Sequence, residues 1–212
     1  MTTLPPLLVL TDRLAAAAHG RTLAETVAAA VGAGTRAVVL REKDLLPTER
    51  RSLGVEIMDT LPPDGRLLIA SDAKLAAELG AAGVHLAVGD RWPAPAANLV
   101  GRSCHDAAEV QAATATGASY VTVSPVYPTA SKPGYGPALG PDGLRDACNV
   151  PDAPPVYALG GIDAPQVPEC LAAGASGVAV MGAVMAAEDP AAAVARLIVA
   201  LGDAPRLREV RG

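Results

Sequence analysis

The 212-residue sequence contains no phenylalanine, one tryptophan and only four tyrosines. Its interior must therefore be built mainly from alanine, valine and leucine, whose small side chains allow helices to pack closely on a sheet. A chain of this length can form one compact domain that buries about 70% of the surface of its unfolded state. We therefore predict a single domain over residues 1–212.

Cysteine and positive charge are also scarce. The three cysteines, Cys104, Cys148 and Cys170, are widely spaced and odd in number, which indicates reduced thiols in a cytoplasmic protein rather than a disulfide framework or a metal site. The net charge of −5 argues against a nucleic acid or an anionic membrane as the partner. The first residues, MTTLPPLLVLTD, are neither basic nor apolar for long enough to predict a secretion signal or a membrane span.

Short apolar runs recur along the chain, and each mostly ends in a polar residue or glycine. Their hydrophobicity is continuous rather than alternating, which is typical of parallel strands buried on both faces. The eight runs are 7–12, 37–42, 67–72, 84–90, 99–103, 120–125, 156–161 and 177–182. Alanine-rich stretches with helical spacing lie between several of them, namely 22–34, 72–83, 105–118 and 189–201. Residues 91–98 are too rich in proline for a helix, and 126–143 form a long loop.

Eight strands that alternate with helices in about 200 residues predict an α/β fold, the (β/α)8 TIM barrel. A doubly wound open sheet is the alternative, but the G-x-G-x-x-G fingerprint that often follows its first strand is absent. In a barrel, the chemistry lies on the loops that follow the carboxyl ends of the strands.

Two cations follow the second predicted strand. Arg41 and Lys43 are two residues apart, so on an extended chain they share a face with Val39. Side by side they repel each other unless an anion lies between them, which predicts an anion site. The alternative is a surface ion pair with Glu42 or Asp44.

Asp72 and Asp90 close two consecutive strands. Two neighbouring carboxylates are costly unless one is protonated or a cation bridges them, and Mg²⁺ commonly binds through one or two carboxylates plus substrate phosphates. We therefore predict a Mg²⁺ site at Asp72 and Asp90. The alternatives are that Asp72 only caps a helix and that Asp90 only forms a turn after Gly89.

Glycines follow the last two strands, where barrels cradle phosphate on backbone N–H groups. Gly160 and Gly161 come after the seventh strand and Gly182 after the eighth. The loop after the sixth strand carries Thr129, Ser131 and Lys132, whose hydroxyls and ammonium predict a lid over residues 128–136 that closes on a polyphosphate.

The histidines carry weaker signals. His85 lies inside a predicted strand, which favours a hydrogen-bonded core residue over a catalyst, and His19 lies in a predicted loop. Cys104 and His105 are adjacent on a strand and would point to opposite faces, which argues against a Cys–His nucleophile.

The motifs at the strand ends occur together in one known family. LREK, SDAKLAAELGAAGVHLAVGD, GRSCH, SPVYPTASKPGYG, ALGGI and GASGVAVMGAV appear here in the order seen in thiamine phosphate synthase. The chain resembles that family, including its thiazole tautomerase relatives, over nearly its whole length. The resemblance implies a transferase of thiamine biosynthesis. In its reaction, hydroxymethylpyrimidine diphosphate loses pyrophosphate and the resulting carbocation is captured by the nitrogen of a thiazole phosphate.

The resemblance also implies roles for individual residues. It assigns the diphosphate to Arg41, Lys43, Ser103 and Lys132, of which Arg41, Ser103 and Lys132 are the expected catalytic residues. It assigns Mg²⁺ to Asp72 and Asp90, and the thiazole phosphate to Thr129, Ser131, Gly160 and Gly161. Small barrels often pair, so a homodimer is one candidate assembly.

Some positions depart from the synthase pattern. Val39 stands where a glutamine usually reads the pyrimidine, Ser71 replaces an asparagine and Gly182 a serine, and Ala87 and Val88 replace the usual Gly-Gln. These substrate-site departures leave open another pyrimidine substrate. The tautomerase has a histidine where Pro125 stands and lacks the aspartate retained at Asp72, so the chain is closer to the synthase. A diverged tautomerase-like member and a non-catalytic barrel that binds a phosphate ligand remain as alternatives.

Overall fold

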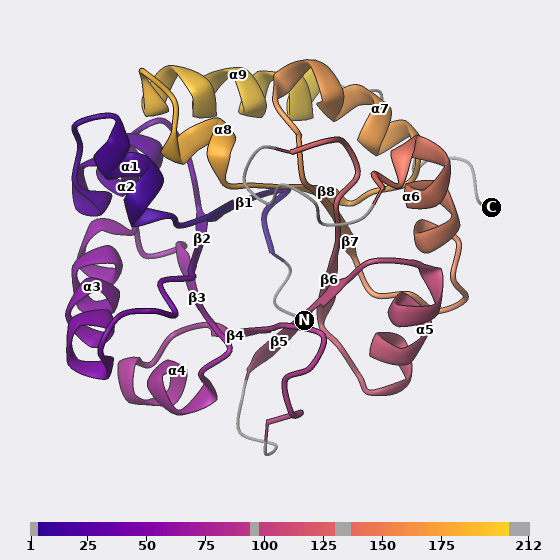
Figure 1. Cartoon of the computed structure of the whole chain (residues 1–212), viewed down its shortest axis with the longest axis horizontal. Helices are drawn as coiled ribbons and strands as arrows, with labels where there is room; N and C mark the ends of the chain where they lie inside the picture. The colour runs from indigo at the N-terminus through magenta and orange to yellow at the C-terminus, as the bar shows by residue number, and fades with distance from the viewer. Residues whose placement is uncertain (1–3, 94–97, 130–136, 204–212) are drawn as a thin grey trace.

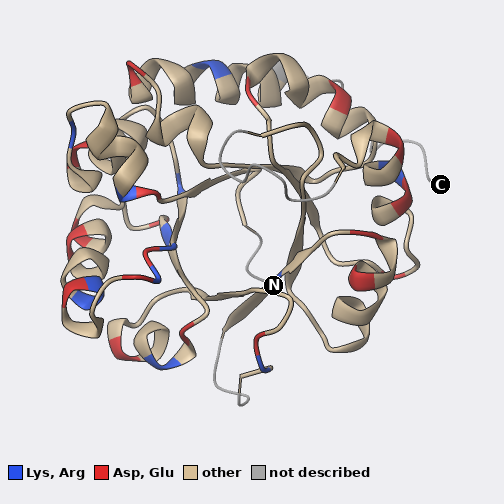
Figure 2. Ribbon diagram, in the orientation of Figure 1, with Lys and Arg blue, Asp and Glu red and all other residues tan. Residues whose placement is uncertain are grey.

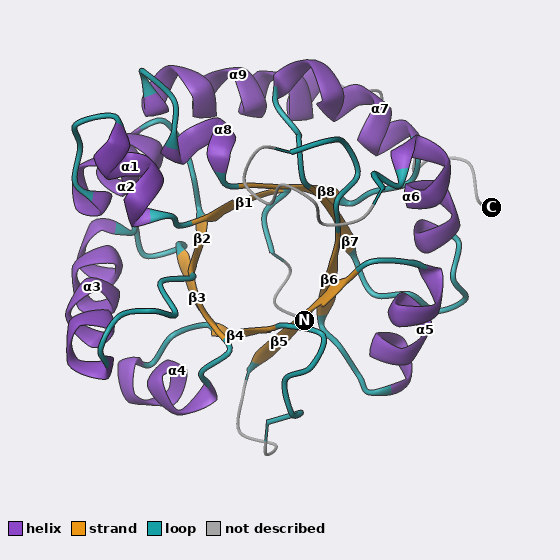
Figure 3. Cartoon of the chain, viewed as in Figure 1, coloured by secondary structure: helices purple, strands orange, loops and turns teal. Residues whose placement is uncertain are grey.

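The computed structural model describes residues 4–93, 98–129 and 137–203 and forms a closed barrel of eight parallel strands in sequential order, β1 to β8. The predicted TIM barrel is therefore confirmed. Figures 1 and 3 show the strands as an inner ring with the helices outside it. The strands are β1 Leu7–Leu10, β2 Ala37–Leu40, β3 Arg66–Ala70, β4 Gly83–Leu86, β5 Leu99–Cys104, β6 Tyr120–Val123, β7 Val156–Leu159 and β8 Gly177–Val180.

Helices cover the ring after most strands. They are α1 Arg13–Ala18, α2 Leu23–Gly32, α3 Pro47–Thr60, α4 Ala73–Leu79, α5 Ala107–Ala115, α6 Gly140–Cys148, the 3₁₀ helix η1 Ala164–Gln166, α7 Val167–Ala172, α8 Gly182–Met185 and α9 Pro190–Asp203. All four predicted helical stretches contain a helix. The loop predicted over 126–143 is shorter than expected because α6 already begins at Gly140.

Local signals explain where these helices begin and end. The Thr22 side chain accepts a hydrogen bond from the Glu25 N–H, and the Glu25 carboxylate accepts one from the Thr22 N–H. These two hydrogen bonds form a capping box at the start of α2. Asp72 caps α4 through the Leu75 N–H, and Gly80 ends that helix at a φ of 65°. Between β4 and β5, no helix occurs in the residues that the structure describes, in agreement with the proline-rich sequence.

The apolar interior has two layers. The larger one lies between the strands and the surrounding helices, and a smaller one fills the barrel itself. The barrel layer includes Leu10, Val39, Tyr120, Tyr157 and Ala179. Most charged residues lie on the outer helices and on the loops at the barrel rim (Figure 2). Within the described residues, no helix has both the length and the apolar character that crossing a membrane requires.

Candidate active site

A cavity of about 660 Å³ opens at the carboxyl ends of the strands. Its lining comes from residues at or just after most of the strands, as the barrel predicts. They include Leu10, Arg41, Ala70, Ser103, Ser124, Gly160 and Met181.

Arg41 and Lys43 both line this cavity. The Arg41 guanidinium lies 3.8 Å from the Met181 sulfur, a weak acceptor. The alternative of an ion pair with Glu42 or Asp44 is wrong in the described part of the chain, because Arg13 pairs with both carboxylates, at 3.3 and 2.7 Å. Arg41 and Lys43 both line the cavity and form no ion pair with Glu42 or Asp44 in that part of the chain, although the charge of Arg41 helps to lower the pKa of Asp44.

The strand itself ends at Leu40, so Arg41 and Lys43 lie in the loop after β2 and not on the strand as expected. At this strand end the Arg41 N–H donates a hydrogen bond to the Thr11 hydroxyl, at 2.9 Å. Burial lowers the pKa of the Lys43 ammonium, and although Asp90 opposes this, the Arg41 charge lowers it further. An anion between the two cations would relieve that repulsion.

Ser103 lies on β5 and faces the cavity beside His85 on β4. The His85 Nε2 atom lies 2.9 Å from the Ser103 hydroxyl, and its Nδ1 atom lies 2.9 Å from the Tyr120 hydroxyl. His85 is only 5% exposed, and burial lowers its pKa to about 4, so the ring is neutral near pH 7. The prediction of a hydrogen-bonded core histidine is confirmed, but the same residue also lines the cavity.

The two predicted metal ligands have other partners within the chain. Asp72 Oδ1 accepts from the Leu75 N–H at 2.8 Å, and its Oδ2 lies 3.5 Å from the guanidinium of Arg50. The helix-cap interpretation of Asp72 is therefore confirmed as a structural role. Neither Asp72 nor Asp90 contributes to the lining of the cavity, and the described residues hold no group of three or more side chains arranged to bind a metal.

Asp90 is joined to Ser71. The Ser71 hydroxyl donates to Asp90 Oδ2, which also accepts from the Ala87 N–H at 2.7 Å. Partial burial raises the pKa of Asp90, but these two hydrogen bonds and the charges of Lys43 and Arg102 together outweigh it, and the pKa is lowered. Ser71 has a φ of 58°, uncommon for a residue other than glycine, and it lies beside the cavity rather than in its lining.

Gly160 and Gly161, which follow β7, also line the cavity. Both have positive φ, 95° and 65°. A Cβ atom at Gly160 would lie 2.9 Å from Pro125, and one at Gly161 would collide with the Pro128 carbonyl. Only glycine fits these two positions, which explains the GG pair.

Gly182 begins the short helix α8 and also lines the cavity. No side chain caps this helix. Thr129 lines the same side of the cavity, whereas Ser131 and Lys132, like most of the predicted lid, lie outside the described residues. Val39 is fully buried in the cavity wall, in register with Leu10 of β1 and Leu68 of β3.

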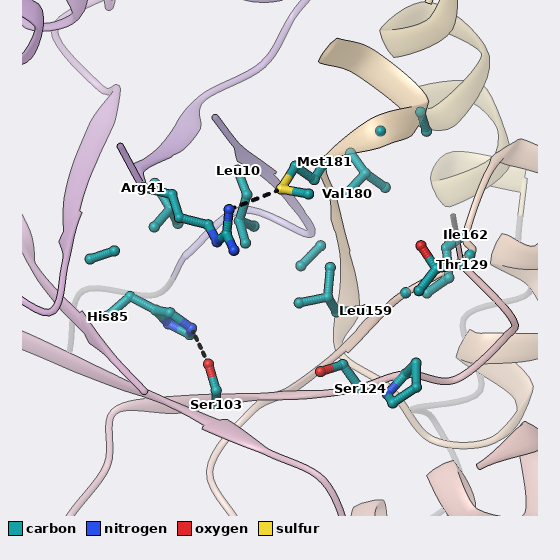
Figure 4. Close-up of a pocket in the computed structure, with 18 of the residues that line it drawn as sticks. Leu10, Arg41, His85, Ser103, Ser124, Thr129, Leu159, Ile162, Val180 and Met181 are labelled. Atoms are coloured by element: carbon teal, nitrogen blue, oxygen red, sulfur yellow. Dashed lines mark hydrogen bonds between the residues drawn. The ribbon is translucent and has the colours of Figure 1, made fainter. Parts of the chain in front are cut away.

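Several lining residues were not predicted. Leu10, Leu159, Val180 and Met181 form an apolar zone between the two polar ends, and Figure 4 shows them between Arg41, His85 and Ser103 on one side and Thr129 on the other. Each lies at or next to the carboxyl end of a strand, which is the signal that could have found them. Apart from Val39, Ala87, Val88 and Pro125, which the family resemblance singled out, only polar side chains and glycines are predicted there from the sequence.

The Cys–His alternative can also be judged from the structure. Cys104 is buried in the outer core, and burial raises its pKa to about 12, whereas His105 lines the cavity and pairs with Glu109. The two side chains face different surroundings, so they do not form a nucleophilic pair.

Known proteins are similar to this chain in sequence and in fold. Residues 7–184 match the family model described as thiamine monophosphate synthase. The chain is 40% identical over 211 residues to a Geobacter sulfurreducens protein of the thiamine-phosphate synthase type, with 96% of both chains covered. It is 38% identical over 194 residues to a thiamine-phosphate synthase of Methanoregula boonei, with 88% of each chain covered.

A solved structure gives the same result. Thiamine phosphate pyrophosphorylase from Pyrococcus furiosus matches with a TM-score of 0.81 and 28% identity, over 92% of this chain and 95% of that chain. The resemblance inferred from the motifs is thereby confirmed, together with the predicted enzyme class, a transferase of thiamine biosynthesis. The chain belongs to the thiamine monophosphate synthase family.

Proposed function

We propose that the chain joins hydroxymethylpyrimidine diphosphate to a thiazole phosphate and releases pyrophosphate. The observation that carries this proposal is the shape of the cavity, which has two polar ends and an apolar zone between them. A cavity with one phosphate site would suit a single ligand. Two phosphate sites on either side of an apolar centre suit two substrates whose rings meet in the middle.

The diphosphate would bind at the end of the cavity lined by Arg41, Lys43 and Ser103. Lys132 lies outside the described residues, and we propose that it also contacts the diphosphate. Arg41 and Lys43 line the cavity without forming an ion pair in the described part of the chain. A guanidinium can donate two parallel hydrogen bonds to phosphate, and an ammonium adds a point charge. These residues would stabilise the negative charge that grows on the departing pyrophosphate.

Asp72 and Asp90 would hold Mg²⁺ at this end. The donor set fits, because both residues offer hard carboxylate oxygens, and Asp90 Oδ1 accepts no hydrogen bond from the residues that the structure describes. Two protein carboxylates leave several coordination positions for water and phosphate. When bound, the ion would neutralise charge on the diphosphate.

The thiazole phosphate would bind at the other end. Gly160 and Gly161 lie there with Thr129 and Gly182, and Ser131 follows in the same loop. The absence of side chains on the glycines allows the phosphate to approach the backbone N–H groups closely. This end then fixes the thiazole with its nitrogen toward the pyrimidine.

The reaction breaks the bond between the pyrimidine methylene carbon and the diphosphate oxygen, and the bonding electron pair leaves with pyrophosphate. The thiazole nitrogen then supplies the electron pair of the new carbon–nitrogen bond. The apolar zone of Leu10, Leu159, Val180 and Met181 limits the access of water, which would otherwise capture the carbocation. None of these side chains offers a competing nucleophile except the weak thioether of Met181.

The test is the formation of thiamine phosphate from the two purified substrates with Mg²⁺. We expect Arg41→Ala to lower kcat/KM by about 10- to 100-fold, because it removes charged hydrogen bonds to the diphosphate. Arg36→Ala is a matched control, since Arg36 precedes the same strand at the opposite end of the barrel and pairs with Asp64. Equal effects of the two substitutions would contradict the proposal.

The alternatives give different results in the same assay. A tautomerase-like enzyme would isomerise a thiazole carboxylate phosphate and form no thiamine phosphate. A non-catalytic barrel would bind pyrophosphate or a phosphate ligand but consume no substrate. Pro125 in the cavity wall leaves no imidazole at the position of the tautomerase histidine, which favours the synthase.

A cytoplasmic location and a homodimer are part of the same proposal. The three free cysteines support a reducing compartment. Light scattering during gel filtration tests the dimer, for which a mass near twice 21.2 kDa is expected.

A further inference from the structure

A chain of three side chains runs from the interior of the barrel to the cavity. Tyr120 begins β6 and is 1% exposed, and its hydroxyl lies 2.9 Å from His85 Nδ1. The other ring nitrogen of His85 lies 2.9 Å from the Ser103 hydroxyl, which faces the cavity. Figure 4 shows His85 and Ser103 joined below Arg41.

The fold makes room for this arrangement at one glycine. Gly101 is paired with Tyr120 on one side and with His85 on the other in the strand register. A Cβ atom at Gly101 would collide with the Tyr120 ring. The missing side chain is therefore what allows the phenol to reach the imidazole.

The direction of the hydrogen bonds follows from the buried phenol. A buried hydroxyl donor needs an acceptor, and His85 Nδ1 is the acceptor in contact with Tyr120 in the described part of the chain. The Tyr157 hydroxyl, which donates to the carbonyls of Leu4 and Pro5, forms no hydrogen bond with the Tyr120 hydroxyl among the described residues. His85 Nδ1 is thus unprotonated.

The single proton of the neutral ring must then lie on Nε2. Burial, together with the charges of Lys43 and Arg102, disfavours a second proton. The Nε2–H donates to the Ser103 oxygen at 2.9 Å, with the Thr122 hydroxyl at 3.5 Å. Since Ser103 accepts this bond, its own proton is free to point into the cavity.

We propose that Tyr120 and His85 are positioning residues that hold Ser103 as a hydrogen-bond donor to the anionic substrate. Ser103 then acts neither as a base nor as a nucleophile, because the group beside it donates a proton to its oxygen instead of removing one. The inference deepens the proposed function and rests on it, since it requires that Ser103 contacts the diphosphate.

The kinetic test is a double-substitution cycle on Ser103 and His85. We expect Ser103→Ala and His85→Leu each to lower kcat/KM by about 10- to 100-fold, with little further loss when combined, because both remove the same oriented donor. His85→Gln places an amide N–H near the position of Nε2 and should restore most of the activity. Losses that multiply in the double variant, or a His85→Gln variant as impaired as His85→Leu, would overturn the inference.

The tyrosine provides a second comparison. Tyr120→Phe removes the donor to Nδ1 and should lower kcat/KM several-fold. Tyr157→Phe is the matched control, because Tyr157 packs edge-on against Tyr120 with ring centroids 5.8 Å apart but donates elsewhere. Equal kinetic effects of the two changes would show that only packing matters.

A measurement independent of activity separates this inference from the proposed function. With only three histidines in the chain, the ¹⁵N resonances of His85 can be assigned by comparison with His85→Gln. At pH 7 we expect the Nε2–H tautomer, and a shift away from it in Tyr120→Phe but not in Tyr157→Phe. An Nδ1–H tautomer or a charged ring overturns the inference even if thiamine phosphate is made. If the Nε2–H tautomer is present but no thiamine phosphate forms, the proposed function is overturned. The role of Ser103 as a donor to the diphosphate, which depends on that function, is then overturned with it.

Discussion

The guanidinium of Arg50 lies 3.5 Å from the carboxylate of Asp72, the same carboxylate that caps helix α4. Arg50 is 7% exposed and also donates to the carbonyls of Leu40 and Ala70, at the ends of β2 and β3. The arginine thereby joins two strand ends to the loop that carries Asp72. Any Mg²⁺ at Asp72 must share that carboxylate with the Arg50 guanidinium, whereas Asp90 Oδ1 accepts no hydrogen bond from the described residues.

The metal proposal can be tested by removing charge without removing the cap. Asp72→Asn keeps a good helix cap, since Asn and Asp are equivalent in that role, and Asp90→Asn removes the second carboxylate. We expect both variants to lose the Mg²⁺-dependent part of pyrophosphate binding in titration calorimetry, about 10- to 100-fold in affinity. Asp106→Asn is the control, because Asp106 caps α5 outside the cavity. Pyrophosphate binding that is equally tight without Mg²⁺ would count against the site.

Val39 bears on how the site recognises the pyrimidine ring. A polar heterocycle against this fully buried valine leaves its polar atoms unpaired, at about 1–3 kcal/mol each, or roughly one to two orders of magnitude in rate or affinity. We expect weak native synthesis of thiamine phosphate that improves in Val39→Gln. Val38→Gln, on the outer face of the same strand, should lower stability without any gain. Robust native activity that collapses in Val39→Gln would show that another group reads the ring. Tight pyrophosphate binding without activity in either form would indicate a different substrate.

Gly161 and Gly80 have the same φ of 65° but different surroundings. A Cβ atom at Gly161 would collide with the Pro128 carbonyl and lie 2.8 Å from Tyr127 Cβ, whereas Gly80 has open space. Alanine at either site should cost about 1–2 kcal/mol of backbone strain. Only Gly161→Ala should also weaken thiazole phosphate binding, by about tenfold or more, as calorimetry would measure. Thermal unfolding gives the stability of both variants. Equal phosphate binding in the two would place the phosphate elsewhere.

The buried imidazole of His85 predicts how stability depends on pH. Its pKa is about 4 in the folded protein, against about 6.5 in the unfolded chain, so the unfolded chain binds more protons between these values. The free energy of unfolding should therefore fall by up to about 3 kcal/mol as pH drops from 6.5 toward 4. Burial is the main cause of the lowered pKa of His85, and the charges of Lys43 and Arg102 lower it further, whereas Asp90 raises it. The hydroxyls of Tyr120 and Ser103, which contact the ring, are neutral.

Urea unfolding at pH 7 and pH 4.5 measures this effect. Subtracting the same measurement on His85→Gln isolates the contribution of His85 from those of the acidic residues. An unchanged pH dependence in His85→Gln would mean that the pKa of His85 is not lowered in the native protein.

Much of the fold follows from local patterns. The continuous apolar runs, such as 37–42 and 120–125, can form only strands that are buried on both faces, and the capping residues Thr22 and Asp72 mark the starts of helices. Eight such runs within 212 residues favour a closed barrel over a doubly wound open sheet, and the structure confirms the closure. The rule that the chemistry of a barrel lies after its strands predicts Arg41, Ser103, Gly160 and Gly161 at one end of the barrel, and all four line the cavity.

The fold, the family and the end of the barrel that carries the site could be predicted from the amino-acid sequence, because these depend on periodicity and on motifs contained in short segments. The contacts between side chains of different strands could not be predicted in this way, because they depend on how the barrel closes. Arg13 reaches Glu42 and Asp44 from 29 and 31 residues away and leaves Arg41 and Lys43 to the cavity. His85 meets Ser103 and Tyr120, 18 and 35 residues distant, because closing the barrel brings β4, β5 and β6 together around Gly101. The physical reason is that hydrogen bonds and ion pairs depend on distances in space, and the separation of two residues along the chain does not fix those distances.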